Sequence, residues 1–217
     1  RLVGRITVDD VMDEVREQAE RDYQLASGLS QDVETDDNVF RQTTARLPWL
    51  LIGMLGGIGN SMILGNFDST FAAHPEMALY IPLIGGTGGN VGTQSSALVV
   101  QGLANSSLNA ENTFKQVLKE SVVALINATI ISMLVYIYNF IRFGATATVS
   151  YSVSISLFAV VMFASIFGTL VPMTLEKLKI DPAIATGPFI SITNDIIGML
   201  MYLSLIHISE PTRRSYI

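Results

Sequence analysis

Long stretches without a charged residue constrain this chain more than any other feature of its sequence. Four uncharged runs of at least 21 residues cover positions 47–67, 77–110, 121–141 and 143–175. A fifth run, 182–209, is interrupted only by Asp195. About 20 apolar residues cross the roughly 30 Å of hydrocarbon in a bilayer. We therefore expect an all-α membrane protein with five transmembrane helices.

The charged residues are concentrated before the first run. Eleven of the 19 acidic residues lie within the first 37 positions, whereas the chain as a whole is 49% hydrophobic and only 15% charged. This composition is too apolar for a soluble domain. We expect a cytoplasmic helical segment (1–29), a linker (30–46), a transmembrane domain (47–207) and a tail (208–217) that continues no helical pattern and looks non-native. Because the chain opens on Arg1 and charged sequence, we expect a fragment without a signal peptide.

Several classes of function are excluded by composition. The chain has no cysteine, which excludes a disulfide scaffold, a Cys-ligated metal centre and a cysteine nucleophile, and its two histidines leave little for His-based chemistry. The formal net charge of -6 argues against a nucleic-acid partner.

Lysine and arginine in the connections between runs predict the orientation. They alternate along the chain: Arg41 and Arg46, then none in 66–76, then Lys115 and Lys119, then Arg142 alone, then Lys177 and Lys179. Cytoplasmic loops carry the positive excess. We expect a multi-pass protein of the inner cell membrane with a cytoplasmic N-terminus and, after five crossings, an external C-terminus.

The acidic segment 7–29 is expected to be a helix. Thr7 and Asp10 fit a capping box. Asp10, Asp13, Glu14 and Glu17 then share one helix face and repel one another. Two interpretations stay open: a solvated face, or a face that divalent cations such as magnesium or calcium neutralise.

The second uncharged run contains a glycine-rich polar segment, 82–96. Such a sequence makes an unstable lipid-facing helix, and a break of this kind is tolerated where it is buried in protein or lines a wet cavity. We place it at a pore, lined by Gly85, Gly86, Gly88, Gly89, Asn90, Thr93 and Gln94. A dinucleotide fingerprint fails because Val91 occupies its third glycine position, and no phosphate-loop Gly-Lys-Ser/Thr follows.

Asp195 is the charged residue within the fifth run. It lies 13 residues after Pro182, or roughly 20 Å along a continuous helix. A carboxylate at that depth needs a partner, a cavity or an ion, and the membrane runs offer no central cationic side chain. A protonated aspartate that clamps two helices is the alternative. Ser191, with Thr193 and Asn194, adds oxygens for a hydrated ion.

A single carboxylate per chain supplies too little negative charge to hold a divalent cation on its own. A twofold homodimer, the commonest symmetry of homo-oligomers, would bring two Asp195 side chains together. A hydrated magnesium ion between them would remove their repulsion and keep its own waters. We infer a divalent-cation pore.

These segments resemble the MgtE family of magnesium channels and transporters. The matching residues are Val8–Asp13, Leu47–Leu51, Pro82–Gln94, Lys119–Glu120, Asp181–Ala183 and Thr193–Gly198. The resemblance implies a homodimer with five transmembrane helices per subunit and a pore on the twofold axis. It also implies cytoplasmic N and CBS domains, with residues 1–29 as the end of the second CBS domain and a connecting helix.

The resemblance also implies roles for single residues. Asp195 matches the pore aspartate for hydrated Mg²⁺, and Ser191 stands where a backbone carbonyl contributes. Asp181 matches an acid near the cytoplasmic mouth that belongs to a further magnesium site. Regulatory Mg²⁺ that closes the channel would be held by Asp10, Asp13 and Asp22. Gln18 and Arg21 depart from the glutamates common in the family, which weakens the expected sensor.

The leading hypothesis is therefore a magnesium channel or transporter, and not an enzyme. A non-transporting membrane cation sensor would need only the acidic helix and an anchor. An intramembrane aspartyl hydrolase would need a second mid-membrane aspartate, whereas Asp68 and Asp181 lie at the ends of uncharged runs. The sequence leaves selectivity among Mg²⁺, Mn²⁺, Co²⁺ and Ca²⁺ open.

Overall fold

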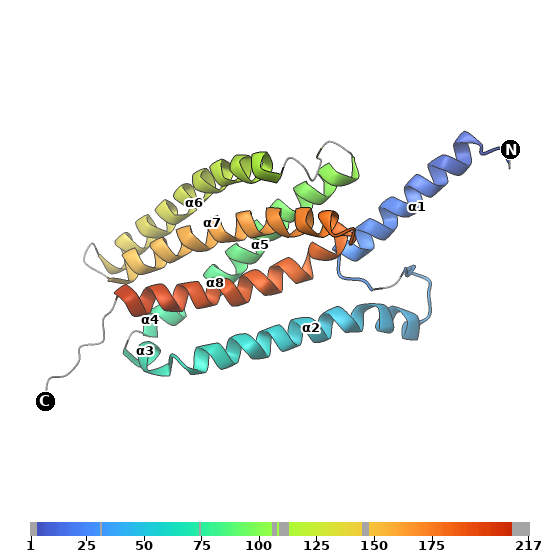
Figure 1. Cartoon of the computed structure of the whole chain (residues 1–217). Helices are drawn as coiled ribbons and strands as arrows, with labels where there is room; N and C mark the ends of the chain where they lie inside the picture. Colours follow the sequence, from blue (N-terminus) through green and yellow to red (C-terminus); the bar gives the residue numbers. More distant parts are fainter. Residues whose placement is uncertain are drawn as a thin grey trace, which may run out of the picture.

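The structure is a computed structural model that describes residues 4–30, 32–73, 75–105, 108, 113–144 and 148–209. Within these residues every regular element is a helix (Figure 1). In chain order they are α1 (Val8–Ala26), α2 (Val39–Gly65), α3 (Asp68–Ala73), α4 (Pro75–Ala78), α5 (Ile81–Ala104), α6 (Thr113–Phe143), α7 (Thr148–Lys177), the 3-10 helix η2 (Pro182–Ala185) and α8 (Pro188–Ser209).

Four of the described helices are long and apolar enough to cross a membrane. They are α2, α6, α7 and α8. The 24-residue helix α5 is long enough as well, at about 36 Å, but its glycine, amide and hydroxyl residues keep it outside this set. The predicted class of all-α membrane protein is confirmed. A fifth crossing by α5 stays a prediction.

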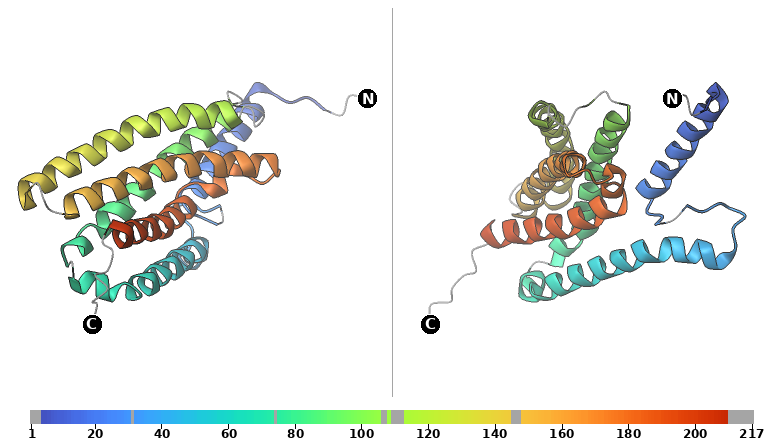
Figure 2. Two further views of the ribbon diagram at one scale, coloured as in Figure 1. Left: turned by 60° about the vertical axis from the view of Figure 1, so that its left-hand side comes forward. Right: turned by 45° about the vertical axis from the view of Figure 1, so that its right-hand side comes forward.

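The long helices after α1 form one bundle. α5 packs against α7 and α8, α6 packs against α7, and α2 packs against α8. Figure 1 shows α2 and α6 on opposite edges, with α7 and α8 between them. α1 extends away from the bundle, as the right-hand view in Figure 2 shows, and contacts it at η2.

The core lies where α5, α7 and α8 meet the short helix α4. It contains Met77, Ile84, Leu157, Val160 and Tyr202, which are almost fully buried. The Tyr202 hydroxyl donates a hydrogen bond of 2.8 Å to the Met77 carbonyl. The buried polar tip of this tyrosine is thereby paired, and α8 is tied to the segment that precedes α5.

Helix α1 confirms the predicted capping box. Thr7 is the N-cap, and its hydroxyl accepts a hydrogen bond from the Asp10 backbone N–H at 3.2 Å. The Asp10 carboxylate in turn accepts the Thr7 N–H at 2.9 Å. Both bonds pair backbone donors of the first turn that have no partner within the helix.

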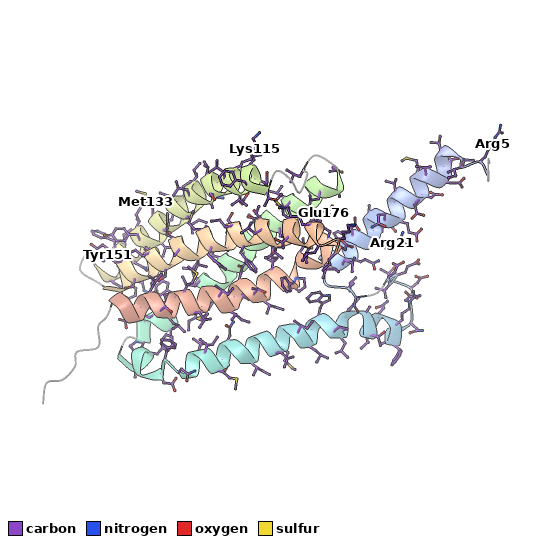
Figure 3. All side chains as sticks on the ribbon, viewed as in Figure 1. Arg5, Arg21, Lys115, Met133, Tyr151 and Glu176 are labelled. Atoms are coloured by element: carbon purple, nitrogen blue, oxygen red, sulfur yellow. The ribbon has the colours of Figure 1, made fainter. Side chains whose placement is uncertain are left out.

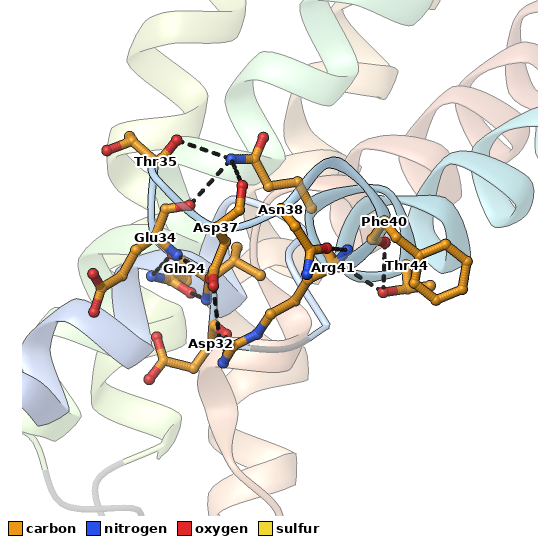
Figure 4. A network of polar contacts seen from close by, with 11 residues as sticks. Gln24, Asp32, Glu34, Thr35, Asp37, Asn38, Phe40, Arg41 and Thr44 are labelled. Carbon is orange, nitrogen blue, oxygen red and sulfur yellow. Dashed lines mark hydrogen bonds and ion pairs between the residues drawn. The ribbon is translucent and has the colours of Figure 1, made fainter.

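The linker is shorter than the sequence predicts because α2 begins at Val39. Asn38 caps this helix: its Oδ1 accepts the Arg41 N–H at 2.8 Å. Pro48, at the start of the first uncharged run, therefore lies inside the helix. Figure 4 shows how polar side chains fix the remaining linker to both helices. Gln24 of α1, for example, exchanges two hydrogen bonds with the backbone of Val33.

The last long helix also begins later than predicted. η2 and α8 are separate elements, and Gly187 between them has φ +54°, a left-handed conformation that suits glycine. Asp195 consequently lies seven residues after the start of α8 at Pro188. The depth along the helix is about 10 Å rather than 20 Å. Of the expected non-native tail, residues 208 and 209 end α8, and the others lie outside the described residues.

The glycine-rich segment is a continuous part of α5, so the predicted break is wrong. Neighbouring helices occupy the space that side chains on the glycines would need. A Cβ at Gly88 would lie 2.9 Å from Val160, and one at Gly168 of α7 would lie 2.4 Å from the Gly92 carbonyl oxygen. Close packing within the protein therefore stabilises a helix that would be weak in lipid.

Candidate cation site

Asp195 lies on the side of α8 that faces α5. Its side chain is partly exposed. The positions opposite it are glycines: a Cβ at Gly85 would lie 3.5 Å from Asp195 Oδ1, and a Cβ at Gly89 would lie 3.2 Å from the same oxygen. The glycines of α5 thus leave room for the carboxylate between the two helices.

Ser191 shares this position, one turn before Asp195. A Cβ at Gly89 would lie 2.8 Å from Ser191 Oγ. One hydroxyl and one carboxylate oxygen therefore meet the same glycine. The structure brings together four residues that the sequence predicts for the site: Asp195, Ser191, Gly85 and Gly89. The side-chain oxygens of Asp195 and Ser191 are the hard ligands that magnesium prefers.

The side chain of Asn194 lies in a different environment from that of its neighbour Asp195. It is 1% exposed, and both of its amide atoms are buried without a hydrogen-bond partner among the described residues. A Cβ at Gly92 would lie 1.8 Å from Asn194 Nδ2, so the amide fills the space that this glycine leaves. Within the protomer Asn194 is a packing residue between helices.

The other predicted pore-lining residues divide between two environments. Gly88 is buried in the packing of α5, whereas Gly86, Asn90 and Gln94 are exposed and Thr93 is partly exposed. The side chains of an exposed helix face must meet lipid, water or another chain. Gln94 lines a separate cavity and not the Asp195 site.

A cavity of about 420 Å³ lies where α1 meets the ends of α5 and α7 and the start of η2. It is lined by both Asp22 and Asp181, together with Gln18, Glu176 and Lys179. Figure 3 labels Glu176 at this end of α7 and Arg21 on α1. The structure thus places two predicted cation ligands on one cavity. Each also has a local bond: Asp22 accepts from Gln18 at 2.7 Å, and Asp181 accepts the Ala183 N–H at 2.9 Å.

The remaining predicted ligands, Asp10 and Asp13, are exposed near the start of α1. The Thr7 hydroxyl and N–H both donate to Asp10 and lower the pKa of its carboxyl below the ordinary value of 3.8. Arg21 pairs with Glu14 at 3.3 Å and Glu17 at 3.0 Å. This arginine therefore neutralises part of the acidic face that the sequence suggests for a cation.

The chain by itself does not complete a metal site of acidic side chains among its described residues. Among the described residues, no three Asp, Glu or His side chains come close enough to hold one ion. A cation beside Asp195 would need water, backbone carbonyls, hydroxyls or a second chain for its other ligands. This requirement agrees with the preference of magnesium for retained waters.

Sequence reasoning assigned no role to Glu120, a buried carboxylate, although Lys119–Glu120 is among the segments that resemble the family. Glu120 of α6 is 8% exposed, and its Oε1 accepts hydrogen bonds from Ser95 of α5, at 2.7 Å, and from Ser165 of α7. Glu120 directly precedes an uncharged run and was counted with the loop residue Lys119. The available signal was the helical sequence on both sides of it, because α6 begins seven residues earlier, at Thr113.

Comparisons with known proteins identify the family of this chain. Residues 81–205 match the MgtE family, described as a divalent cation transporter. The magnesium transporter MgtE of Bacillus subtilis (strain 168) is 33% identical over 204 residues, which make up 94% of this chain and 45% of that protein. The magnesium transporter MgtE of Thermus thermophilus is 33% identical over 211 residues, 94% of this chain and 46% of that protein.

The Enterococcus faecalis protein of the same name is 29% identical over 204 residues, again 94% of this chain and 45% of that protein. This chain therefore spans less than half the length of these curated relatives. The family match, residues 81–205, includes every residue of the Asp195 site.

Proposed function

We propose that this chain, which belongs to the MgtE family of divalent cation transporters, conducts hydrated Mg²⁺ across the membrane past Asp195. The family consists of transporters and not of enzymes. The observation that carries the proposal is the pairing of Asp195 and Ser191 with Gly85 and Gly89, which leaves oxygen ligands and space between two packed helices. Magnesium is proposed as the ion because the three relatives are named magnesium transporters.

The proposed pore is formed by two copies of the chain. One protomer offers a single carboxylate at the site, and α5 leaves Gly86, Asn90 and Gln94 exposed. A polar helix face is costly in contact with lipid. A second chain across a twofold axis would cover this face and supply the second Asp195. The two carboxylates would bind the hydrated ion through its waters.

The proposed gate is the contact of α1 with the start of α8. A Cβ at Gly187 would lie 2.1 Å from the Ala26 carbonyl oxygen, so the end of α1 touches the turn that leads into the Asp195 helix. Asp22 and Asp181 line the adjacent cavity. Regulatory Mg²⁺ bound there, with Asp10 and Asp13 serving other cytoplasmic domains, would hold the closed state.

The proposed topology and domains rest on the distribution of lysine and arginine along the chain and on the family resemblance. Residues 1–29 would be the end of a CBS domain and a connecting helix in the cytoplasm. The linker joins them to a transmembrane domain within 47–207, in which α5 is the fifth crossing. The ion would enter the cytoplasm, driven by its gradient and the membrane potential, and the C-terminus would lie outside.

The test is growth of a magnesium-uptake-deficient bacterial strain that expresses this chain fused to an intact cytoplasmic region. We expect wild type to rescue growth at low magnesium and Asp195→Asn to fail, because the swap keeps size and removes the charge. The matched control is Asp68→Asn, the same change at the exposed start of α3, which should rescue growth.

Each other outcome has a definite meaning. Rescue by Asp195→Asn would contradict the proposal and favour a neutral helix clamp at that position. If all three proteins reach the membrane and none rescues, the acidic α1 and the anchored bundle would instead fit a non-transporting cation sensor.

A further inference from the structure

Three oxygens from three different helices meet at Glu120. Ser95 of α5 donates to Glu120 Oε1 at 2.7 Å, Ser165 of α7 donates to the same oxygen, and the two serine oxygens are 3.0 Å apart. All three side chains are buried. We propose that Glu120, Ser95 and Ser165 form a second divalent-cation site, distinct from Asp195.

The charge of Glu120 is the first reason. The ion pairs that the structure describes involve Arg21 of α1 and Arg41 in the first turn of α2, both distant in sequence from Glu120, and Lys119, which lines the same cavity as Glu120, is exposed and in none of these pairs. A carboxylate that is 8% exposed inside a helix bundle is costly without a compensating positive charge. Two hydroxyl donors reduce this cost, but they bring no charge.

The number of protons is the second reason. If both serine hydroxyls donate to Glu120, no proton remains between the two serine oxygens, which are 3.0 Å apart. A cation coordinated by the three oxygens would account for this close contact. Neighbouring ligands of an octahedral Mg²⁺, each 2.0–2.1 Å from the ion, are about 2.9 Å apart. Two of the three oxygen–oxygen distances, 2.7 and 3.0 Å, lie on either side of this value, and the contact between Ser165 and Glu120 is shorter.

The adjoining cavity provides space for the remaining ligands. It has a volume of about 590 Å³ between α5 and α6, and Ser95, Glu120 and Ser165 all lie on its wall. The amide side chains of Gln94 and Asn127 line it as well. Magnesium retains waters in protein sites, and such amides can bind those waters. The cavity therefore suits an ion with three protein ligands and three waters.

The proposed site lies away from the Asp195 path. α5 presents Gly85 and Gly89 to Asp195, but presents Gln94 and Ser95 to the Glu120 cavity. An ion at Glu120 would hold α5, α6 and α7 together rather than move between them. The choice of a divalent ion rests on the proposed function; the need for a positive charge at Glu120 does not.

The test counts Mn²⁺ ions bound to the 217-residue chain in detergent micelles, with free Mn²⁺ measured by electron paramagnetic resonance and Mg²⁺ as competitor. We expect Glu120→Gln to bind one Mn²⁺ fewer per chain than wild type, because the amide keeps the shape and loses the charge. Glu34→Gln, the same change in the exposed linker, should bind as many as wild type.

Equal Mn²⁺ binding by wild type and Glu120→Gln would overturn the inference and mean that a proton holds the three oxygens together. Should Glu120→Gln fail to fold, Ser165→Ala keeps the carboxylate and decides the matter. The Mn²⁺ affinity of this site should then fall by about tenfold or more, and unchanged affinity would overturn the inference. Asp195→Asn measured in parallel separates this site from the proposed pore, since its loss of Mn²⁺ should add to that of Glu120→Gln.

Discussion

Asp195 and Glu120 are two carboxylates beside the same helix, and α5 accommodates them in opposite ways. Toward Asp195 it presents glycines, so the carboxylate keeps free space and partial exposure. Toward Glu120 it presents Ser95, which binds the carboxylate and leaves it almost fully buried. The first arrangement suits an ion that passes, because few bonds hold it. The second suits a group that fixes helices in place.

The largest expected effect separates these two roles in transport. In proteoliposomes, Asp195→Asn should reduce the rate of Mg²⁺ uptake on the order of a hundredfold, because a charged ligand to the ion is lost. Glu120→Gln should reduce it much less, because Glu120 lies outside the proposed path. Measured uptake rates at equal protein incorporation test this. An equal loss in both variants would contradict the division between the two faces of α5.

The second-largest expected effect is a loss of stability when the glycine packing between α5 and α8 is disturbed. In Gly92→Ala the new Cβ would lie 1.8 Å from Asn194 Nδ2 and 2.8 Å from Ile190. We expect a loss of about 2–3 kcal/mol in the free energy of unfolding, the cost of overpacking a core. The control is Gly86→Ala on the same helix, where no atom lies within 4 Å of the new Cβ.

Unfolding in detergent followed by circular dichroism measures the difference between these variants. Because alanine favours helix over glycine by about 1 kcal/mol, Gly86→Ala should match or slightly exceed wild type. Equal destabilisation by both substitutions would mean that the glycines serve the helix backbone and not the contact with Asn194.

Two serines of α7, Ser165 and Ser156, test whether the bonds to Glu120 stabilise the fold. Ser165→Ala removes a donor to Glu120, and we expect a loss of about 1.5 kcal/mol, typical of a hydrogen bond to a charged group. Ser156→Ala removes a buried hydroxyl that has no hydrogen-bond partner among the described residues, so it should be neutral or stabilising. The same unfolding measurement decides, and similar values for both would show that Ser165 contributes no net stability through Glu120.

These contrasts show what the sequence could predict. Asp195 stood out because it interrupts an uncharged run, and Thr7 with Asp10 predicted a helix start that the structure confirms. Glu120 was missed because it lies at the edge of a run, where charge counting assigns it to a loop. Its burial depends on Ser95 and Ser165, which are distant in sequence.

The glycine-rich segment failed as a prediction for a related reason. Local propensity favoured a break in 82–96, but contacts from α7 and α8 keep the helix continuous. The distance of Asp195 from the start of its helix was overestimated because the left-handed Gly187 separates η2 from α8. The continuity of α5 depends on tertiary contacts, and the start of α8 depends on one backbone conformation. Neither can be read from the hydrophobic periodicity of the sequence.

The smallest expected effect comes from a hydroxyl and a carboxylate paired in water. Thr7 Oγ donates to Asp10 at 2.6 Å at the exposed start of α1, the same chemical pair as Ser95 and Glu120. The two Thr7 bonds lower the pKa of Asp10 from 3.8. Their stabilisation is therefore present above pH 3.8 and disappears as the pH falls through the lowered pKa.

Thr7→Val should raise the pKa of Asp10 back toward 3.8, because the hydroxyl donor is its largest cause of lowering. The helix should fray in its first turn only, with no change in the unfolding of the bundle, because solvent screens the pair. Carbon-13 NMR titration of the Asp10 carboxyl measures the shift, and Thr43→Val on α2, whose hydroxyl bonds only its own helix backbone, is the control. An unmoved titration would mean that the Thr7 backbone N–H alone sets the pKa, and a hydroxyl would then matter to a carboxylate in this protein only where both are buried.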